Sequence, residues 1–355
     1  MKNRSAVPLA GKPQSGCSQN SAGREPILPV NSHSVDQKSG EICTGQANLQ
    51  PISFKSDRLL AAEFIPIQKL TVFGVGLIGG SLALALKAAG AVKQVVGVGR
   101  NPANMQLALT HGLIDSVAEN VVDAVRDAEM VVLAMPVGQM AAVMQAIALH
   151  VRPGTVVTDA GSTKLDVVSL MRQHLAHHLP YCVPAHPIAG AELSGPLAAR
   201  ADLYKQRQVV LTPLPDTTTT AIDRVTAMWR QCGASVTQMH DTDHDATFAA
   251  VSHLPHVLAY ALVDMLAGRS NAAQLFEFAA SGFRDFTRIA ASSPEMWRDI
   301  ALSNQAALLN ELDAYQRQLT YLHDALAKGD GQRLLESFAR AQTARQAWSA
   351  NPNAS

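Results

Sequence analysis

The stretch Lys69-Leu-Thr-Val-Phe-Gly-Val-Gly-Leu-Ile-Gly-Gly-Ser81 decides the fold of this chain. In it, a short apolar run meets Gly74, Gly76 and Gly79 in the spacing G-x-G-x-x-G, and a run with helical character follows. The pattern predicts a strand, a tight turn and a helix, in which the glycines permit the turn, a close approach to pyrophosphate and tight helix packing. The helix N-terminus adds unpaired N–H groups that bind phosphate. Because a second strand is predicted at Gln94–Val98, we interpret the stretch as a dinucleotide site rather than a plain glycine-rich turn.

The residues after that second strand bear on which dinucleotide binds. An Asp or Glu there would accept hydrogen bonds from the adenosine ribose, but the chain has Gly99-Arg100-Asn101. The guanidinium of Arg100 can pair with a 2′-phosphate, so NADP is favoured and NAD stays possible. The alternative is that Arg100 is only a solvated loop charge. Around the glycines, further cofactor contacts are expected from Leu77, Ile78, Arg100, Asn101 and Pro136.

Composition limits the class of protein. With 355 residues and 47% hydrophobic content, the chain can bury a large core and is expected to hold two domains plus extra sequence. The formal net charge is zero and no basic stripe interleaved with aromatic residues is present, which argues against a nucleic-acid partner. The four cysteines lack paired metal-type spacing, so we expect a reducing, cytoplasmic compartment and no disulfide framework.

Residues 1–66 differ from the rest of the chain. They are rich in Ser, Gly, Asn, Gln and Pro and lack a sustained apolar period, which predicts a disordered tail. The first 24 residues carry basic but no acidic side chains, so a transit peptide is conceivable. Since neither an apolar core for secretion nor a clear amphipathic helix is present, we favour a dispensable tail.

One apolar window, Met130–Leu149, contains no charged residue and is nominally long enough to cross a bilayer. Pro136 and Gly138 interrupt it. We therefore predict a buried strand at 130–134 and a helix over about 139–150, and no membrane association.

The order of predicted elements gives the fold class. From Lys69 to about Met239, strands alternate with helices, which predicts an α/β doubly wound sheet of the Rossmann type as a domain over 67–240. Beyond Asp241 no convincing strand is found, so an all-α domain for substrate binding and dimerisation is predicted over 241–350. The later strands are expected at 155–158, 181–183, 208–211 and 234–237, and the helices of the second domain at 246–266, 295–326 and 331–348.

Polar groups are expected to matter where strands of such a sheet end, because ligands bind beyond the carboxyl ends. Asp159–Lys164 follows one predicted strand, and a segment with His186 and Glu192 follows another. Two further polar groups, Ser252–His256 and Gly282–Arg288, lie in the helical region.

At these motifs the chain resembles the prephenate/arogenate dehydrogenases of tyrosine biosynthesis, roughly over residues 69–297. The resemblance is carried by His186-Pro-Ile-Ala-Gly190, Ser252-His-Leu-Pro-His256 and Gly282-Phe-Arg-Asp-Phe-Thr-Arg288 behind the Rossmann motif. It implies oxidative decarboxylation: a hydride passes from the ring carbon bearing the 4-hydroxyl to the nicotinamide, and the ring carboxylate leaves as CO2. Whether prephenate or arogenate is preferred stays open, as does inhibition by tyrosine.

The resemblance implies catalytic roles for two residues. His186 matches the histidine that accepts the 4-hydroxyl proton, a role suited to a neutral imidazole, although a structural histidine is the alternative. Ser162 matches a serine that hydrogen-bonds near the same hydroxyl, and its alternative is to cap the following helix.

The remaining implied residues bind substrate. Arg288 matches the arginine that holds a substrate carboxylate with two hydrogen bonds. Arg284, four residues earlier and on the same face if the segment is helical, is a second candidate ligand, or it pairs with Asp285 or a neighbouring acid. Ser252 and His256 match contacts to the substrate side chain, and His253 is expected to fix a turn before Pro255. Two residues have weaker assignments, namely Glu192 at the active-site mouth, or merely exposed, and Trp297 near the pocket, or in the core.

Two histidine motifs look metal-like. His253-x-x-His256 has Pro255 inside it and lacks a third convergent ligand. In His240-Asp-Thr-Asp-His244-Asp245, helix capping by Asp241 or Thr242 with acids in the first turn is the favoured interpretation. No metal is therefore expected.

Two other functions remain open at this point. An NADP-linked β-hydroxyacid-type dehydrogenase would give Lys164 a catalytic role, although that family keeps its lysine in the helical domain. A non-catalytic NADP-sensing module would need no histidine at a sheet end. A homodimer is expected, because Val257–Val263 and Ala306–Leu309 offer more apolar surface than one sheet-facing stripe would use, and the resemblance implies pairing through this domain.

Overall fold

The computed structural model describes residues 64–191 and 193–350. The chain divides into residues 1–60 and 61–355, and the described residues belong to the second unit. The prediction of a disordered tail at 1–66 thus falls almost entirely outside the described residues, and so does the assignment of Glu192.

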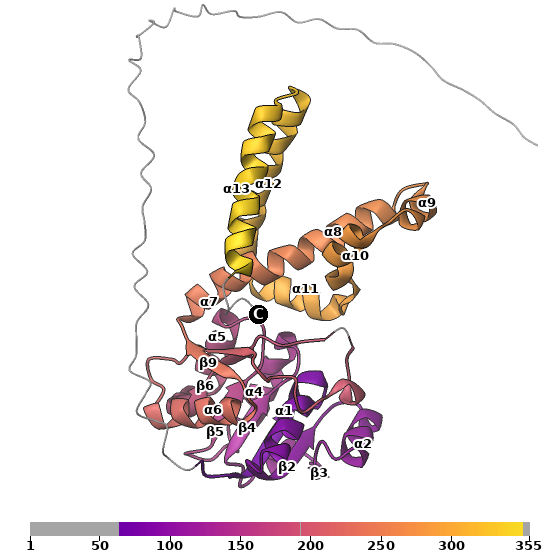
Figure 1. The fold of residues 1–355 in the computed structure, drawn as a ribbon. Coiled ribbons are helices and arrows are strands. Elements are labelled where there is room, and N and C mark those ends of the chain that lie inside the picture. Colours follow the sequence, from indigo (N-terminus) through magenta and orange to yellow (C-terminus); the bar gives the residue numbers. More distant parts are fainter. Residues whose placement is uncertain (1–63, 192, 351–355) are drawn as a thin grey trace, which may run out of the picture. The chain divides into compact units, whose positions relative to one another are not determined.

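A six-stranded parallel sheet forms the first part of the described chain, in the order β3-β2-β1-β4-β5-β6 (Figure 1). This is the strand order of a doubly wound Rossmann sheet, whose order reverses between β1 and β4. The strands are β1 (Ile67–Phe73), β2 (Val92–Val98), β3 (Ser116–Val117), β4 (Met130–Leu133), β5 (Val156–Asp159) and β6 (Cys182–Val183). The helices are α1 (Leu77–Ala88), α2 (Pro102–Thr110), α3 (Val121–Val125), α4 (Met140–Ile147), α5 (Leu165–His174) and α6 (Thr219–Gln231).

Two hydrophobic clusters cover the two faces of this sheet. Along β4, Met130 and Val132 belong to the cluster with α1 and α6, while Val131 and Leu133 belong to the cluster with α4 and α5. Successive side chains of a strand point to opposite faces, so a strand covered on both faces is apolar throughout. The apolar window 130–149 is accordingly a strand, a short 3-10 turn and α4, as predicted.

The glycine motif of the first turn has the geometry that its spacing predicts. Gly74 has φ of +91°, and a Cβ there would lie 2.7 Å from the carbonyl oxygen of Ala134. A Cβ on Gly79 would clash with the backbone of Gly74 and lie 2.8 Å from Val72 Cγ1, so only glycine allows α1 this close to β1. Among the described residues, no atom lies within 4 Å of such a Cβ on Gly76, which leaves room for a ligand at the start of α1.

The prediction that all later strands join this sheet is wrong. The chain forms a separate three-stranded sheet of β7 (Ala185–Pro187), β8 (Gln208–Leu211) and β9 (Ser235–Gln238). Here β7 and β8 are antiparallel, and β8 and β9 are parallel. Only Pro184 separates β6 from β7. Because a parallel neighbour needs a crossover of about a dozen residues or more, β7 cannot follow β6 in the parallel sheet.

From Asp241 to Ser349 the described chain is helical, without a strand, as predicted. One continuous helix comprises α7 (Asp241–Phe248), a π-helical turn (Ala249–His253) and α8 (Leu254–Ala267). The remaining helices are α9 (Ala272–Glu277), α10 (Ser281–Thr287), α11 (Pro294–Ser303), α12 (Gln305–Ala327) and α13 (Gly331–Ser349), and α12 and α13 lie side by side (Figure 1).

Two details of the helical part differ from expectation. The chain does not leave the helix before Pro255, because the π-helical segment Ala249–His253 runs directly into α8. The predicted role of His253, to fix a turn between separate elements, is therefore wrong. Proline lacks an N–H donor, and a π-helical turn accommodates the missing bond within one helix. The helix predicted over 295–326 ends and restarts at Asn304, whose side chain instead donates to the carbonyl oxygen of Asp245 at 2.7 Å.

Candidate active site

A cavity of about 660 Å³ lies at the glycine turn, beyond the carboxyl ends of β1, β2 and β4. Of the residues predicted to bind the cofactor, Gly74, Gly76, Arg100, Asn101 and Pro136 line it. No described residue that lines it is acidic. The open space beside Gly76 and the uncapped N-terminus of α1 fit the phosphates of a nicotinamide dinucleotide.

Asn101 has a structural task in this cavity. Its Oδ1 accepts hydrogen bonds from the backbone N–H groups of Ala103 at 2.9 Å and Asn104 at 3.2 Å, which caps α2. The cap holds the loop that carries Arg100 at the exposed rim of the cavity.

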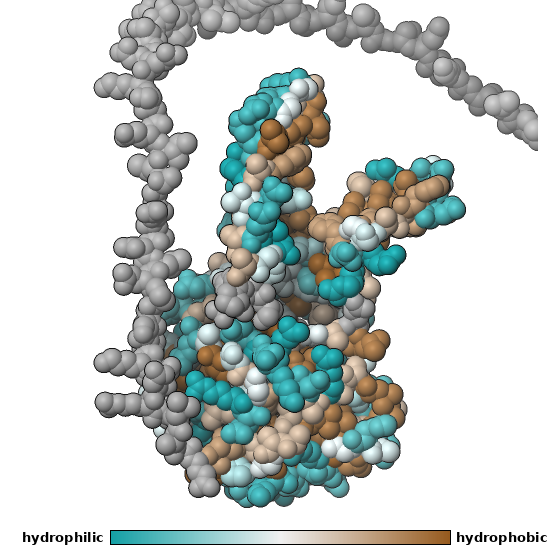
Figure 2. Space-filling view, in the orientation of Figure 1, coloured by the Kyte–Doolittle hydropathy of each residue, from teal (hydrophilic) through white to brown (hydrophobic). Residues whose placement is uncertain are grey.

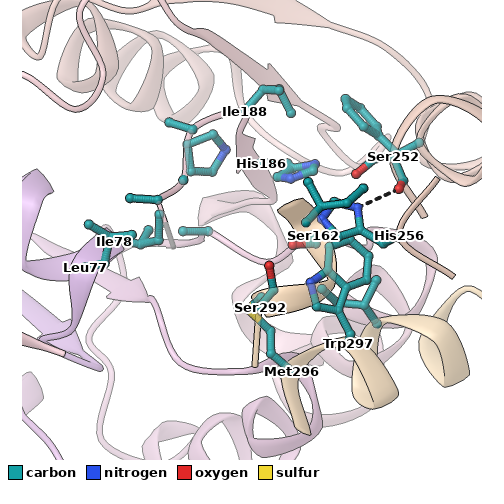
Figure 3. A pocket seen from close by; sticks show the side chains of 18 of the residues that line it. Leu77, Ile78, Ser162, His186, Ile188, Ser252, His256, Ser292, Met296 and Trp297 are labelled. Atoms are coloured by element: carbon teal, nitrogen blue, oxygen red, sulfur yellow. Dashed lines mark hydrogen bonds between the residues drawn. The ribbon is translucent and has the colours of Figure 1, made fainter. Parts of the chain in front are cut away.

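A second cavity of about 500 Å³ brings together five segments that are distant in the sequence (Figure 3). Leu77 and Ile78, predicted to bind cofactor, line this cavity rather than the first and so connect the two. The predicted catalytic and substrate residues that line it are Ser162, His186, Ser252, His256, Arg288 and Trp297. Sequence reasoning missed its apolar wall, which includes Ile188, Phe248, Ile289, Met296 and Ile300.

Arg284 does not belong to this group. It is exposed on α10 and is not among the cavity-lining residues. Because α10 ends at Thr287 and Arg288 begins a 3-10 turn, the two arginines do not share one α-helical face, as the spacing had suggested.

His186 lies on β7, in the small second sheet, with 9% of its surface exposed. Its ring packs against those of His244 and Phe248, with centroid distances of 5.0 and 4.8 Å. Burial lowers the pKa of His186 well below its usual value, and the positive charge of Lys164 adds to this. The imidazole is therefore neutral near pH 7, and Nδ1 lies 2.8 Å from His244 Nε2, which leaves Nε2 for a ligand.

Ser162 is not the cap of α5, so that alternative is wrong. The helix begins after Lys164 without a side-chain cap from its own loop. Instead, the carboxylate of Asp245 accepts the backbone N–H groups of Lys164 at 2.8 Å and Leu165 at 2.9 Å. The helical domain thus caps a helix of the Rossmann domain.

A buried ion pair holds the backbone next to His186. Lys164 and Asp159, both fully buried, form a salt bridge. Lys164 Nζ also donates to the carbonyl oxygen of Ala185 at 2.8 Å, and Asp159 accepts from the N–H of Ala185 at 3.0 Å and of Gly161 at 2.7 Å. Burial raises the pKa of Asp159, and Lys164 opposes that effect. Lys164 does not line the cavity, which argues against a direct catalytic role.

His256 and Trp297 form one wall of the cavity. Their rings stack at a centroid distance of 3.5 Å and an angle of 19°. His256 Nδ1 lies 2.9 Å from the carbonyl oxygen of Ser252, which can only accept, so Nδ1 carries the proton and Nε2 remains for a ligand (Figure 3). Burial lowers the pKa of His256, and the positive charge of Arg288 adds to this.

The prediction for the acidic histidine motif at 240–245 is confirmed for its first-turn acids but not for its cap. His240 occupies the cap position of α7 without a side-chain hydrogen bond, and Asp241 is the first helical residue, so capping by Asp241 or Thr242 is wrong. The acids Asp241 and Asp243 do lie in the first turn. Within residues 64–191 and 193–350 no group of three or more His, Cys, Asp or Glu side chains could hold a metal ion.

Two family models match consecutive parts of the chain. The nucleotide-binding domain of prephenate dehydrogenase matches residues 82–238, and its dimerization domain matches residues 240–340. The chain belongs to the prephenate dehydrogenase family. It is therefore an oxidoreductase of tyrosine biosynthesis that uses a nicotinamide cofactor, with the Rossmann and helical domains that the sequence predicted.

Similar proteins with known names support this family assignment. It is 38% identical to a cyclohexadienyl dehydrogenase of Zymomonas mobilis, over 78% of this chain and 95% of the relative, and 34% identical to a Bacillus subtilis prephenate dehydrogenase, over 76% and 73%. A solved prephenate dehydrogenase of A. aeolicus, in complex with hydroxyphenyl propionate and NAD+, is 32% identical with a TM-score of 0.75, covering 80% of this chain and 99% of that one.

Proposed function

We propose that this enzyme oxidises prephenate to 4-hydroxyphenylpyruvate and CO2, with hydride transfer to NADP. The observation that carries the proposal is the one cavity in which His186, His256 and Arg288 meet Leu77 and Ile78 at the start of α1, next to the glycine turn. A substrate in this cavity has a neutral base, a cationic group and the cofactor edge within one space of about 500 Å³.

His186 acts as the base. Its free Nε2 accepts the proton of the 4-hydroxyl while the hydride leaves the same ring carbon for the nicotinamide, which supplies the oxidising chemistry when bound. The electron pair of the breaking ring–carboxylate bond then makes the ring aromatic and ends on the 4-oxygen, which takes the proton back from His186. Protons and electrons balance without another reactant.

The other residues position the substrate. Arg288 holds a carboxylate through its guanidinium fork, and Ser162 hydrogen-bonds near the 4-hydroxyl. Ser252 and His256 contact the side chain, with the stacked ring of Trp297 holding His256 in place. A carboxylate can bind His256 only through Nε2–H, so binding takes up a proton at this ring.

Arg100 supports the choice of NADP over NAD. It lines the cofactor cavity at the end of β2, where no described acidic residue is present to accept hydrogen bonds from a ribose. A 2′-phosphate would pair with its guanidinium.

We further propose a homodimer in the cytoplasm. The matched family model is named a dimerization domain. The helix Asp241–Ala267 is the one described helix long and apolar enough to span a membrane. Because it carries the cavity residues Ser252 and His256, we favour a second copy of the chain, rather than a membrane, as the partner that covers its apolar surface. Figure 2 shows apolar residues on the surface of the helical part. Five apolar side chains of this part are exposed: Val251, Met265, Leu309, Leu335 and Phe338. Leu308, which the sequence also suggested for the interface, is 4% exposed and packs within the chain.

A direct assay tests the proposed reaction. Purified protein is mixed with prephenate or arogenate and with NADP or NAD, and reduced nicotinamide is followed by absorbance. We expect fastest turnover with prephenate and NADP. Faster turnover with arogenate would reassign the substrate, and no turnover with either would refute the proposal.

A further inference from the structure

We propose that His244 is a positioning residue that fixes the ring tautomer of His186 and supports its imidazolium form during catalysis. The inference rests on the role of His186 in the function proposed above. It concerns a residue that does not line the substrate cavity and is fully buried.

Hydrogen bonds link Asp245 to His244 and His244 to His186, and they define which ring nitrogen carries each proton. The Asp245 carboxylate lies 2.8 Å from His244 Nδ1, and a carboxylate accepts, so His244 Nδ1 carries the proton. His244 Nε2 is then an acceptor, 2.8 Å from His186 Nδ1, which must donate. His186 is thereby held with its proton on Nδ1 and with Nε2 unprotonated, the form that can accept a proton from substrate.

Asp245, at one end of this series of hydrogen bonds, is itself held in place by several hydrogen bonds. Besides His244, the carboxylate of Asp245 holds the N–H groups of Lys164 and Leu165, and its backbone carbonyl accepts from Asn304 at 2.7 Å. Burial raises the pKa of Asp245, but the hydrogen bonds from His244 and from the two backbone N–H groups outweigh this and lower it. The carboxyl is therefore ionised at neutral pH. Four elements, β7, α7, α5 and the start of α12, therefore set the orientation of one imidazole.

The surroundings explain why His186 needs such a partner. The charged and titratable groups around the two imidazoles are Asp159, Lys164, Asp245 and, from the π-helical turn, His253. The ring of Phe248 packs against both histidines and supplies no acceptor. An imidazolium in a buried site without an acceptor for Nδ1–H would be strongly disfavoured, and His244 Nε2 is that acceptor.

Two variants of His244 separate a positioning role from packing. His244→Leu keeps an apolar side chain but removes the acceptor, whereas His244→Gln can place Oε1 where Nε2 lies. For His244→Leu we expect kcat to fall about a hundredfold with KM for prephenate nearly unchanged, the range for a misplaced acid–base group. For His244→Gln we expect kcat within about tenfold of the wild type.

The tautomer is measured independently of turnover, by NMR of protein with ¹⁵N-labelled histidine. In the wild type we expect His186 with Nδ1 protonated and Nε2 bare, and a mixture of tautomers in His244→Leu. Wild-type His186 protonated on Nε2, or equal kcat losses in the two variants with unchanged tautomer, would overturn the assignment. If the wild type turns over neither substrate, the proposed function fails, while the NMR result still decides the role of His244.

Discussion

Replacing Lys164 with methionine removes the charge that holds the backbone before His186. In the wild type, Lys164 and Asp159 are fully buried and bonded to each other, and both bind the backbone of Ala185. Methionine fills a similar volume but leaves the Asp159 carboxyl buried without its cation. Breaking a buried pair in this way costs about 3–5 kcal/mol.

The loss of folding stability in Lys164→Met should depend on pH. Burial already raises the folded-state pKa of Asp159, and without Lys164 nothing opposes this except two backbone N–H groups. A carboxyl whose folded pKa is raised stabilises the fold below the unfolded pKa of about 3.9, and that stability is lost as pH rises through the folded value. The variant should therefore be more destabilised at pH 8 than at pH 5.

Urea unfolding monitored by circular dichroism at both pH values measures the effect. The matched control is Lys87→Met, since Lys87 forms a partly exposed salt bridge with Asp115. Exposed pairs contribute about 0–1 kcal/mol, so this control should change stability little. Equal losses in the two variants, or a Lys164→Met variant that gains stability with rising pH, would show that the buried pair does not hold this segment.

Four further predictions follow from the site. His186→Asn should lower kcat about a hundredfold or more while product affinity, measured by calorimetry, stays close to wild type; near-normal turnover across pH would remove His186 as base. Arg100→Ala should weaken NADP binding by about 1.5–3 kcal/mol, and NAD binding much less, in fluorescence titrations; equal losses for the two cofactors would refute the pairing of Arg100 with a 2′-phosphate. Because burial lowers the pKa of His256 and a bound carboxylate requires its protonated form, substrate affinity should fall as pH rises, and this slope should vanish in His256→Asn; a wild type with flat affinity contradicts the assignment. Leu309→Glu, at a 50% exposed position, should produce monomers in light scattering, whereas Leu149→Glu, at a 91% exposed position on the Rossmann domain, should not; a stable active monomer in the wild type would refute the dimer.

Local patterns of the sequence determined the elements that depend on a few neighbouring residues. The glycine spacing predicted the turn before α1, because steric limits at Gly74 and Gly79 act over a few residues. The apolar run at Met130–Leu133 predicted a buried strand, and helical spacing predicted the all-α part after Asp241. Helix limits were less accurate at Asn304, where a contact to the distant Asp245 ends one helix.

Only the tertiary structure decided which side chains meet. His186 and His244 are 58 residues apart, and Asp245 caps a helix that begins 80 residues earlier, so no local pattern encodes either contact. The same holds for Leu308 and Leu309, which are adjacent and equally apolar, although Leu308 is 4% exposed and Leu309 is 50% exposed. Such pairings depend on how the helical domain docks on the Rossmann domain, and docking is the sum of many weak contacts spread along the whole chain.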